Sequence, residues 1–173
     1  MNELDLSKIK VAIFDFDDTL AIHRDKDYLN KRKSSEENFV NFYKNAYLNP
    51  ENFYDDIEIC DMSDTLYKLI DILRKQGTKI YCLSGMKFSF QLKAKENFVH
   101  KHYGNDIEFL ISKSQEMKVE GIKVIRAINN CNLDEILFVD ELEENIDRFK
   151  KLGINALFPD EAKDLIIKGE VWK

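Results

Sequence analysis

Short, almost entirely apolar runs alternate with helix-length amphipathic segments along most of this sequence. A strand that is apolar on both faces needs cover on both sides, as in a parallel sheet flanked by helices. The runs lie at residues 9–14, 80–83, 107–111, 136–139 and 156–158. Helical patterns lie between them, at residues 62–76, 88–103, 119–130 and 143–152. This order predicts a doubly wound, Rossmann-like α/β fold with a mainly parallel sheet, whose ligands bind at the carboxyl ends of the strands.

Length and charge limit the classes of protein that fit. A chain of 173 residues with 44% hydrophobic residues can bury one sizeable core and is too short for two ordinary domains. Its 32 acidic residues outnumber the 26 basic ones, so it has no general attraction for nucleic acid backbones or anionic lipid. We expect one globular unit without bulk nucleic-acid binding, and its oligomeric state stays open.

The cysteines and the amino terminus indicate a compartment. The three cysteines, Cys60, Cys82 and Cys131, lack CxxC spacing, and residues 1–10 lack the basic and apolar regions of a signal peptide. No apolar run approaches the roughly 20 residues that a membrane helix needs. These features predict a cytoplasmic protein with reduced cysteines and no association with a membrane.

Residues 21–61 interrupt the alternation, because they contain no strand-like run. Their clearest element is an amphipathic helix over residues 36–48 with an aromatic stripe. About forty residues is long for a plain connection in a compact domain. We therefore expect residues 21–61 to form a small helical cap inserted after the first strand, on a core of residues 1–20 and 62–173. The alternative is a longer crossover helix that packs on the sheet and has no gating role.

Polar side chains follow the predicted strands where each strand ends. The run VAIFDFDDTL places Asp15 and Asp17 after the first strand, and residues two apart in an extended chain face the same way. Ser84 and Gly85 end the second predicted strand, and Asp140 follows a later one. Because parallel strands end at the same edge of a sheet, we expect these residues to share one crevice.

The acidic residues at this edge favour a metal ion. Carboxylates that lie close together repel one another unless a cation lies between them. Oxygen ligands select Mg²⁺, which proteins commonly hold with one or two carboxylates and a substrate phosphate. The sequence has no histidine or cysteine cluster suited to a softer metal. Mg²⁺ is therefore the expected cofactor.

Four motifs resemble those of the haloacid dehalogenase-like superfamily. FDFDDTL resembles the first motif, aspartate-x-aspartate-x-threonine or valine after an apolar strand, and CLSG is similar to the second, a serine or threonine that ends the next core strand. Lys118 resembles the third, and ILFVDELEENI the fourth, an acidic pair or spaced acids after another strand. The motifs occur in this order over residues 11–146, so the likeness covers nearly the whole chain.

The resemblance implies phosphoryl transfer through an aspartyl-phosphate. Asp15 would be the nucleophile. Asp17 would protonate the leaving oxygen and then take a proton from the hydrolytic water. Ser84, Gly85 and Lys118 would bind the phosphoryl group and offset its charge. This implies a Mg²⁺-dependent phosphatase that hydrolyses a small phosphorylated substrate.

The resemblance also implies the metal ligands. Asp15, Asp140 and the backbone carbonyl of Asp17 would hold Mg²⁺, together with Glu141. The second acid of the fourth motif is frequently an aspartate in the family, and here it is Glu141. Glu144 is an alternative at a spacing that the family also uses.

Two further choices stay open. Lys113 and Lys123 compete with Lys118 for the lysine role, and we prefer Lys118 because it combines a helix start with a distance from Asp140 that is similar to the family's. The competing function is a phosphoacceptor or binding module with this fold and with weak or no turnover. The departure at Glu141 allows that alternative.

Overall fold

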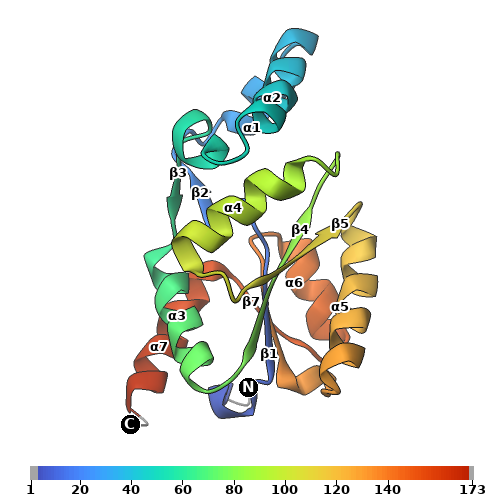
Figure 1. Cartoon of the computed structure of the whole chain (residues 1–173). Coiled ribbons are helices and arrows are strands. Elements are labelled where there is room, and N and C mark those ends of the chain that lie inside the picture. Colours follow the sequence, from blue (N-terminus) through green and yellow to red (C-terminus); the bar gives the residue numbers. More distant parts are fainter. Residues whose placement is uncertain (1–3, 172–173) are drawn as a thin grey trace.

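A five-stranded sheet forms the centre of the computed structural model, which describes residues 4–171 (Figure 1). All five strands run parallel: β1 (Val11–Phe14), β4 (Lys79–Gly85), β5 (Glu108–Ser112), β6 (Ile136–Val139) and β7 (Asn155–Leu157). Their order across the sheet is β5-β4-β1-β6-β7, so the chain winds outward in both directions from the central β1. The predicted α/β fold with a parallel sheet is confirmed.

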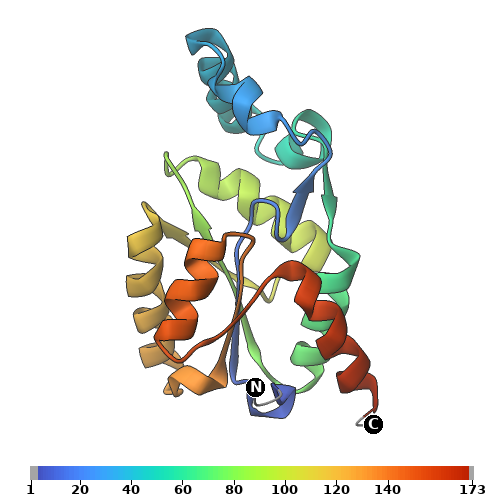
Figure 2. The same ribbon diagram turned by 180° about the vertical axis from the view of Figure 1, so that it is seen from behind.

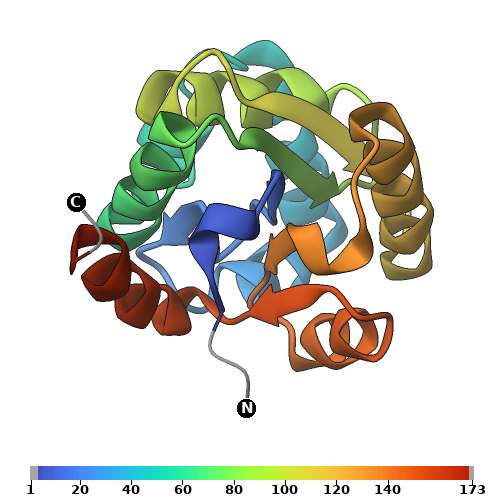
Figure 3. The same ribbon diagram turned by 90° about the horizontal axis from the view of Figure 1, so that it is seen from below.

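Helices cover both faces of this sheet. The long ones are α3 (Asp64–Lys75), α4 (Gln91–Tyr103), α5 (Gln115–Asn129), α6 (Glu143–Lys151) and α7 (Ala162–Val171). Three short 3₁₀ turns complete the core: η1 (Leu6–Lys8), η3 (Leu133–Glu135) and η4 (Pro159–Glu161). Figures 2 and 3 show α5 and α6 against one face, and α3, α4 and α7 on the other. Within residues 4–171, no helix combines the length and the apolar character needed to cross a membrane.

The side chains of β1 alternate between the two cores, as the pleat of a strand requires. Val11 and Ile13 belong to the core beneath α5 and α6, whereas Ala12 and Phe14 belong to the core beneath α3, α4 and α7. All four are fully buried. Burying a side chain as large as Phe14 contributes roughly 1.5–3 kcal/mol, so β1 is a rigid support for the residue that follows it.

A serine cap fixes where α5 begins. The Oγ of Ser114 accepts a hydrogen bond from the backbone N–H of Met117 (3.3 Å), which satisfies a donor that the first turn leaves free. The helix therefore begins at Gln115, four residues before the predicted start at position 119. Lys118 consequently lies within the first turn of α5.

The segment between β1 and α3 contains two strands as well as helices. Its elements are β2 (Ala21–His23), α1 (Tyr28–Lys33), α2 (Glu36–Leu48), the one-turn π-helix η2 (Phe53–Ile57) and β3 (Cys60–Met62). The two strands pair antiparallel. The prediction that residues 21–61 contain no strand is wrong, because three-residue strands are too short to give an apolar run. The predicted helix over residues 36–48 matches α2.

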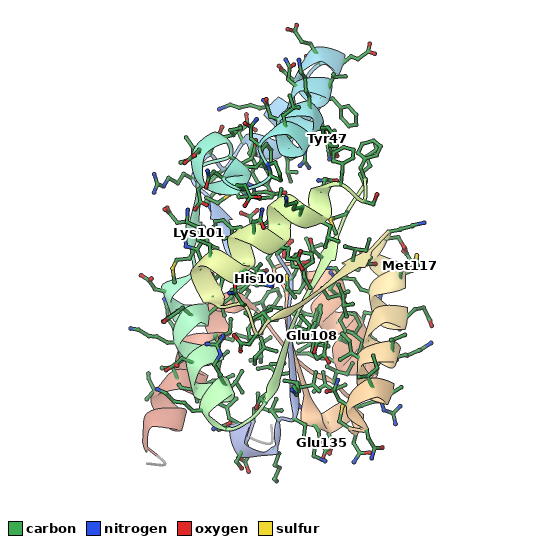
Figure 4. All side chains as sticks on the ribbon, in the orientation of Figure 1. Tyr47, His100, Lys101, Glu108, Met117 and Glu135 are labelled. Carbon is green, nitrogen blue, oxygen red and sulfur yellow. The ribbon has the colours of Figure 1, made fainter. Side chains whose placement is uncertain are left out.

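The helices of this segment lie beyond the carboxyl ends of the strands and are held there through α4 (Figure 1). The ring of Tyr54 in η2 packs edge-on against Phe16, with 4.7 Å between centroids. Asp55 of η2 accepts hydrogen bonds from Lys101 (3.0 Å) and His102 (2.6 Å) of α4. Figure 4 shows Lys101 on α4 and Tyr47 on α2 above it. Aromatic packing and ion pairs thus attach the inserted helices to the core.

Candidate active site

Three predicted site residues lie together at the carboxyl ends of the three central strands, β4, β1 and β6. Asp15 directly follows β1, and its backbone N–H donates to the carbonyl oxygen of Val139 in β6 (2.9 Å). Ser84 is the second-last residue of β4, and Asp140 directly follows β6. All three side chains are buried. The sheet therefore fixes two carboxylates and one hydroxyl in a single crevice.

Lys118 of α5 connects the two carboxylates. Its Nζ lies 2.8 Å from Oδ1 of Asp15 and 2.8 Å from Oδ2 of Asp140, and the side chain is 1% exposed. Burial raises the pKa of Asp15, and the neighbouring ammonium opposes this rise. Burial alone would lower the pKa of Lys118, but the charges of Asp15 and Asp140 outweigh it and raise the pKa. The ammonium is therefore held in its charged form between two acids.

The two competing lysines lie elsewhere. Lys123 forms an exposed ion pair with Glu120 (2.8 Å) on the outer side of α5. Lys113 is exposed and lines the mouth of the cavity that Lys118 also lines. Among the three candidates, Lys118 is the one that contacts Asp15 and Asp140.

Backbone and amide groups at the start of α6 hold the carboxylate of Asp140. Its Oδ1 accepts the backbone N–H of Leu142 (2.9 Å), and its Oδ2 accepts the Nδ2 of Asn145 (2.8 Å). Asn145 is fully buried. Asn145 therefore supports the loop that carries Asp140.

Asp15, Asp140 and Glu141 form an acidic cluster in which each residue offers one oxygen, all within 4.8 Å of one another. Burial, followed by the charges of Asp15 and Asp140, raises the pKa of Glu141 to about 9. Thr19 steadies Glu141 by donating its hydroxyl to Oε2 (3.1 Å). Glu144 instead pairs with Arg148 (2.5 Å) on the exposed side of α6.

This donor set suits a hard divalent cation. The three carboxylates supply oxygen ligands. Mg²⁺ and Ca²⁺ bind oxygen ligands, whereas softer metals favour nitrogen and sulfur ligands. The raised pKa of Glu141 reflects repulsion and desolvation that a cation at this place would relieve. The side chain of Asp17 is not part of the cluster, so only its backbone could serve such an ion.

The carboxylate of Asp17 lies outside the acidic cluster and binds a lysine that sequence reasoning missed. Nζ of Lys95 lies 2.6 Å from Oδ2 of Asp17, 2.8 Å from Oγ of Ser84 and 3.2 Å from the carbonyl oxygen of Gly85. Lys95 is 2% exposed on α4. A signal was present in the sequence, because Lys95 lies on the apolar stripe of that helix, next to Ala94 and four residues before Val99.

Asp18 belongs to the turn that leads out to the inserted segment. Its backbone adopts a positive φ of 50°, which an aspartate tolerates better than most residues. The hydroxyl of Tyr28 donates to its Oδ2 (3.3 Å), and His23 lowers the pKa of its carboxyl. Tyr28 and His23 stack with 3.5 Å between ring centroids. Asp18 thus joins the end of β1 to the start of the inserted helices.

A cavity of about 340 Å³ opens beside these groups. Its lining residues are Asp15, Asp17, Gly85, Met86, Lys87, Lys113, Ser114, Lys118 and Glu141. Carboxylates and ammonium groups therefore both line the cavity. Such a space can accept a dianionic group together with a divalent cation, and both Asp15 and Asp17 line it.

Comparison by sequence finds neither a protein-family model nor a curated protein that matches this chain. Comparison of structures finds solved proteins with a similar fold. A phospho-aspartyl intermediate analogue of phosphoserine phosphatase matches with a TM-score of 0.57 and 20% identity, over 93% of this chain and 90% of that one. A protein described as a predicted HAD-like family hydrolase from Porphyromonas gingivalis matches with a TM-score of 0.55 and 16% identity, over 88% and 91% of the two chains. The chain therefore has the fold of the haloacid dehalogenase-like superfamily, as its four motifs predict.

Proposed function

We propose that this protein is a Mg²⁺-dependent phosphatase that hydrolyses a phosphomonoester through an aspartyl-phosphate on Asp15. The observation that carries the proposal is the placement of Asp15 at the end of the central strand, in contact with Lys118 and at the wall of the cavity. The likeness to a phospho-aspartyl intermediate analogue of phosphoserine phosphatase supports it. The protein would be cytoplasmic and act on a small phosphorylated substrate.

Asp15 would attack the phosphorus of the ester. The new bond joins a carboxylate oxygen of Asp15 to phosphorus as the bond from phosphorus to the ester oxygen breaks. Asp17 gives its carboxyl proton to that leaving oxygen, so an alcohol departs. Water then attacks the aspartyl-phosphate, Asp17 takes a proton from it, and phosphate and free Asp15 result. Asp17 lines the same cavity as Asp15, which suits both proton transfers.

Ser84, Gly85 and Lys118 would bind the phosphoryl oxygens. The hydroxyl of Ser84 and the backbone at Gly85 lie at the end of β4, beside β1. Lys118 is already held by Asp15, so its charge would lie beside the attacking group, where negative charge would develop in the transition state. Donors fixed in this way need little rearrangement during the reaction, which favours catalysis.

The metal would be held by Asp15, Asp140, Glu141 and the backbone carbonyl of Asp17. A bound Mg²⁺ would neutralise phosphoryl charge and orient the group for in-line attack. Asn145 and the backbone of Leu142 would orient Asp140 for this role.

Residues 21–61 would act as a cap on a core formed by residues 1–20 and 62–173. The inserted helices lie beyond the strand ends, and Lys87 at the cavity wall contacts the ring of Phe39 in α2, with Nζ 4.5 Å from the centroid. A cap in this position would shape the space around the leaving group and thereby select the substrate.

The test is turnover of p-nitrophenyl phosphate and of a panel of phosphorylated metabolites, with and without Mg²⁺. We expect Mg²⁺-dependent release of phosphate by the wild type, and a loss of at least about 100-fold in Asp15→Asn and in Asp17→Asn. If the wild type gives no Mg²⁺-dependent turnover above Asp15→Asn on any substrate, the protein is instead a phosphoacceptor or binding module with this fold.

A further inference from the structure

We propose that Lys95 is a positioning residue of this site, which holds the carboxylate of Asp17 and the hydroxyl of Ser84 in their working orientations. The inference rests on the proposed phosphatase function. Lys95 lies outside the four motifs, and its role would be to support the transfer of a proton from Asp17 to the leaving oxygen.

The contacts of Lys95 use its full hydrogen-bonding capacity. A lysine ammonium has three N–H donors and no acceptor. Here three acceptors lie within reach, namely Oδ2 of Asp17, Oγ of Ser84 and the carbonyl oxygen of Gly85, at 2.6, 2.8 and 3.2 Å. The ring of Phe16 covers another side of the ammonium, with its centroid 4.8 Å from Nζ. The position of the ammonium is therefore tightly defined.

The bond to Asp17 fixes the plane of that carboxylate. Lys95 holds Oδ2, and the side chain of Asp17 remains 32% exposed at the cavity wall. Oδ1 of Asp17 is then the oxygen that can form a hydrogen bond with the leaving oxygen of a substrate. Proton transfer needs the donor within hydrogen-bond reach of the ester oxygen, so loss of this restraint would weaken the step.

The bond to Ser84 determines which way its hydroxyl can donate. Because Lys95 donates to Oγ, the hydroxyl accepts on that side and its own hydrogen must point elsewhere. The Ser84 hydroxyl donates this hydrogen to the carbonyl oxygen of Gly85, with 3.3 Å between the two oxygens, and Gly85 lines the cavity. A phosphoryl oxygen in the cavity can take the place of this weak acceptor. One ammonium thus organises both the acid that protonates the leaving group and a donor to the phosphoryl group.

Burial makes a purely structural role for Lys95 costly. Most of its neighbours on the buried face of α4 are apolar, including Ala94, Phe98 and Val99, and Gln91 is the other buried polar residue there. An apolar side chain there would avoid the cost of desolvating an ammonium. The ammonium of Lys95 lies where it can bind both Asp17 and Ser84.

The test compares two substrates of nearly the same shape, phenyl phosphate and p-nitrophenyl phosphate, in wild type and Lys95→Met. The p-nitrophenolate ion leaves without a proton, whereas phenolate leaves poorly unless it is protonated. We expect Lys95→Met to lower kcat/KM for phenyl phosphate by about 100-fold and for p-nitrophenyl phosphate by about 10-fold. In an Asp17→Asn background, adding Lys95→Met should leave the ratio between the two substrates unchanged.

Lys93→Met is the matched control, because Lys93 lies on the same helix and its side chain is 63% exposed in a surface pair with Glu51. It should change neither rate. If Lys95→Met does not fold, Lys95→Gln, which keeps a neutral donor, takes its place with both substrates. Equal loss on the two esters, or no loss, in a folded variant of an active enzyme overturns the role of Lys95 alone. A wild type that turns over neither ester overturns the phosphatase proposal and this one together.

Discussion

The two buried lysines of the candidate site each contact more than one polar or acidic partner. Lys118 lies between Asp15 and Asp140, and Lys95 lies between Asp17 and Ser84. A buried charge is costly without a partner, so removal of one member affects stability as well as chemistry. At this scale, the two lysines divide the acids of the site into two groups, one suited to a metal and one suited to proton transfer.

Lys118→Met should destabilise the metal-free protein by about 3–5 kcal/mol, because it leaves two buried carboxylates without their ammonium. Chemical denaturation measures this change in the free energy of unfolding. Lys123→Met is the control, because Lys123 is 63% exposed, and it should shift stability by less than about 0.5 kcal/mol. A folded Lys118→Met variant as stable as the wild type would contradict the account of this ion cluster.

The raised pKa of Glu141 predicts how stability depends on pH. The folded protein holds the proton of Glu141 more tightly than the unfolded chain, so stability is lost as pH rises from the ordinary value of 4.5 through about 9. Unfolding measured with a chelator present should show this decline, and Glu141→Gln should reduce it. Glu144→Gln, at an exposed carboxylate, should leave the decline unchanged. An identical pH profile for Glu141→Gln and wild type would contradict the raised pKa.

At the scale of elements, the parts of the fold with strong local signals could be predicted and the parts set by long-range contacts could not. Strands buried on both faces give apolar runs, which is why β1, β4 and β6 could be located from sequence. β2 and β3 could not, since each has three residues and gains its hydrogen bonds from a partner about forty positions away.

The same contrast holds for the candidate site. Asp15, Asp17, Ser84 and Asp140 end predicted strands, so their meeting at one edge follows from the topology. Lys95 joins Asp17 across 78 positions of sequence, and a single lysine on an amphipathic helix is normally read as solvated. The apolar stripe around Lys95 is a signal of its burial, but its contact with Asp17 could be known only once α4 had been placed over the end of β1.

The π-helix η2 should be the element that holds the inserted helices on the core. Phe53 is fully buried between Phe42 of α2 and Tyr54, at centroid distances of 5.2 and 5.0 Å. Phe53→Ala should cost about 3–5 kcal/mol and raise the rate of proteolysis within residues 24–59. Val40→Ala, at a side chain of α2 that is 50% exposed, should do neither. Unchanged proteolysis in Phe53→Ala would show that η2 does not anchor the insertion.

At the scale of the whole molecule, a parallel sheet covered on both faces brings distant residues to one edge and the insertion lies above that edge (Figure 1). Residues that are 103 positions apart, Asp15 and Lys118, are joined in this way. The site is thus a property of the complete fold, and a ligand that binds it should stabilise the molecule as a unit.

Mg²⁺ should therefore raise the midpoint of thermal unfolding. A ligand at 100 times its dissociation constant adds about 2.7 kcal/mol to the stability of a folded protein that alone binds it. Thermal scans with increasing Mg²⁺ measure the shift, and Asp140→Asn should abolish most of it. A shift of equal size in Asp140→Asn would mean that the ion binds elsewhere.

In the proposed mechanism, Asp15 carries the phosphoryl group during turnover. The most direct measurement is the mass of the intact protein, followed by peptide mapping, after rapid acid quenching of the reaction with substrate and Mg²⁺. We predict a population heavier by one phosphoryl group, with the modification on Asp15, and its loss in Asp15→Asn. Turnover without any phosphorylated Asp15, or a phosphoryl group on another residue, would contradict the account.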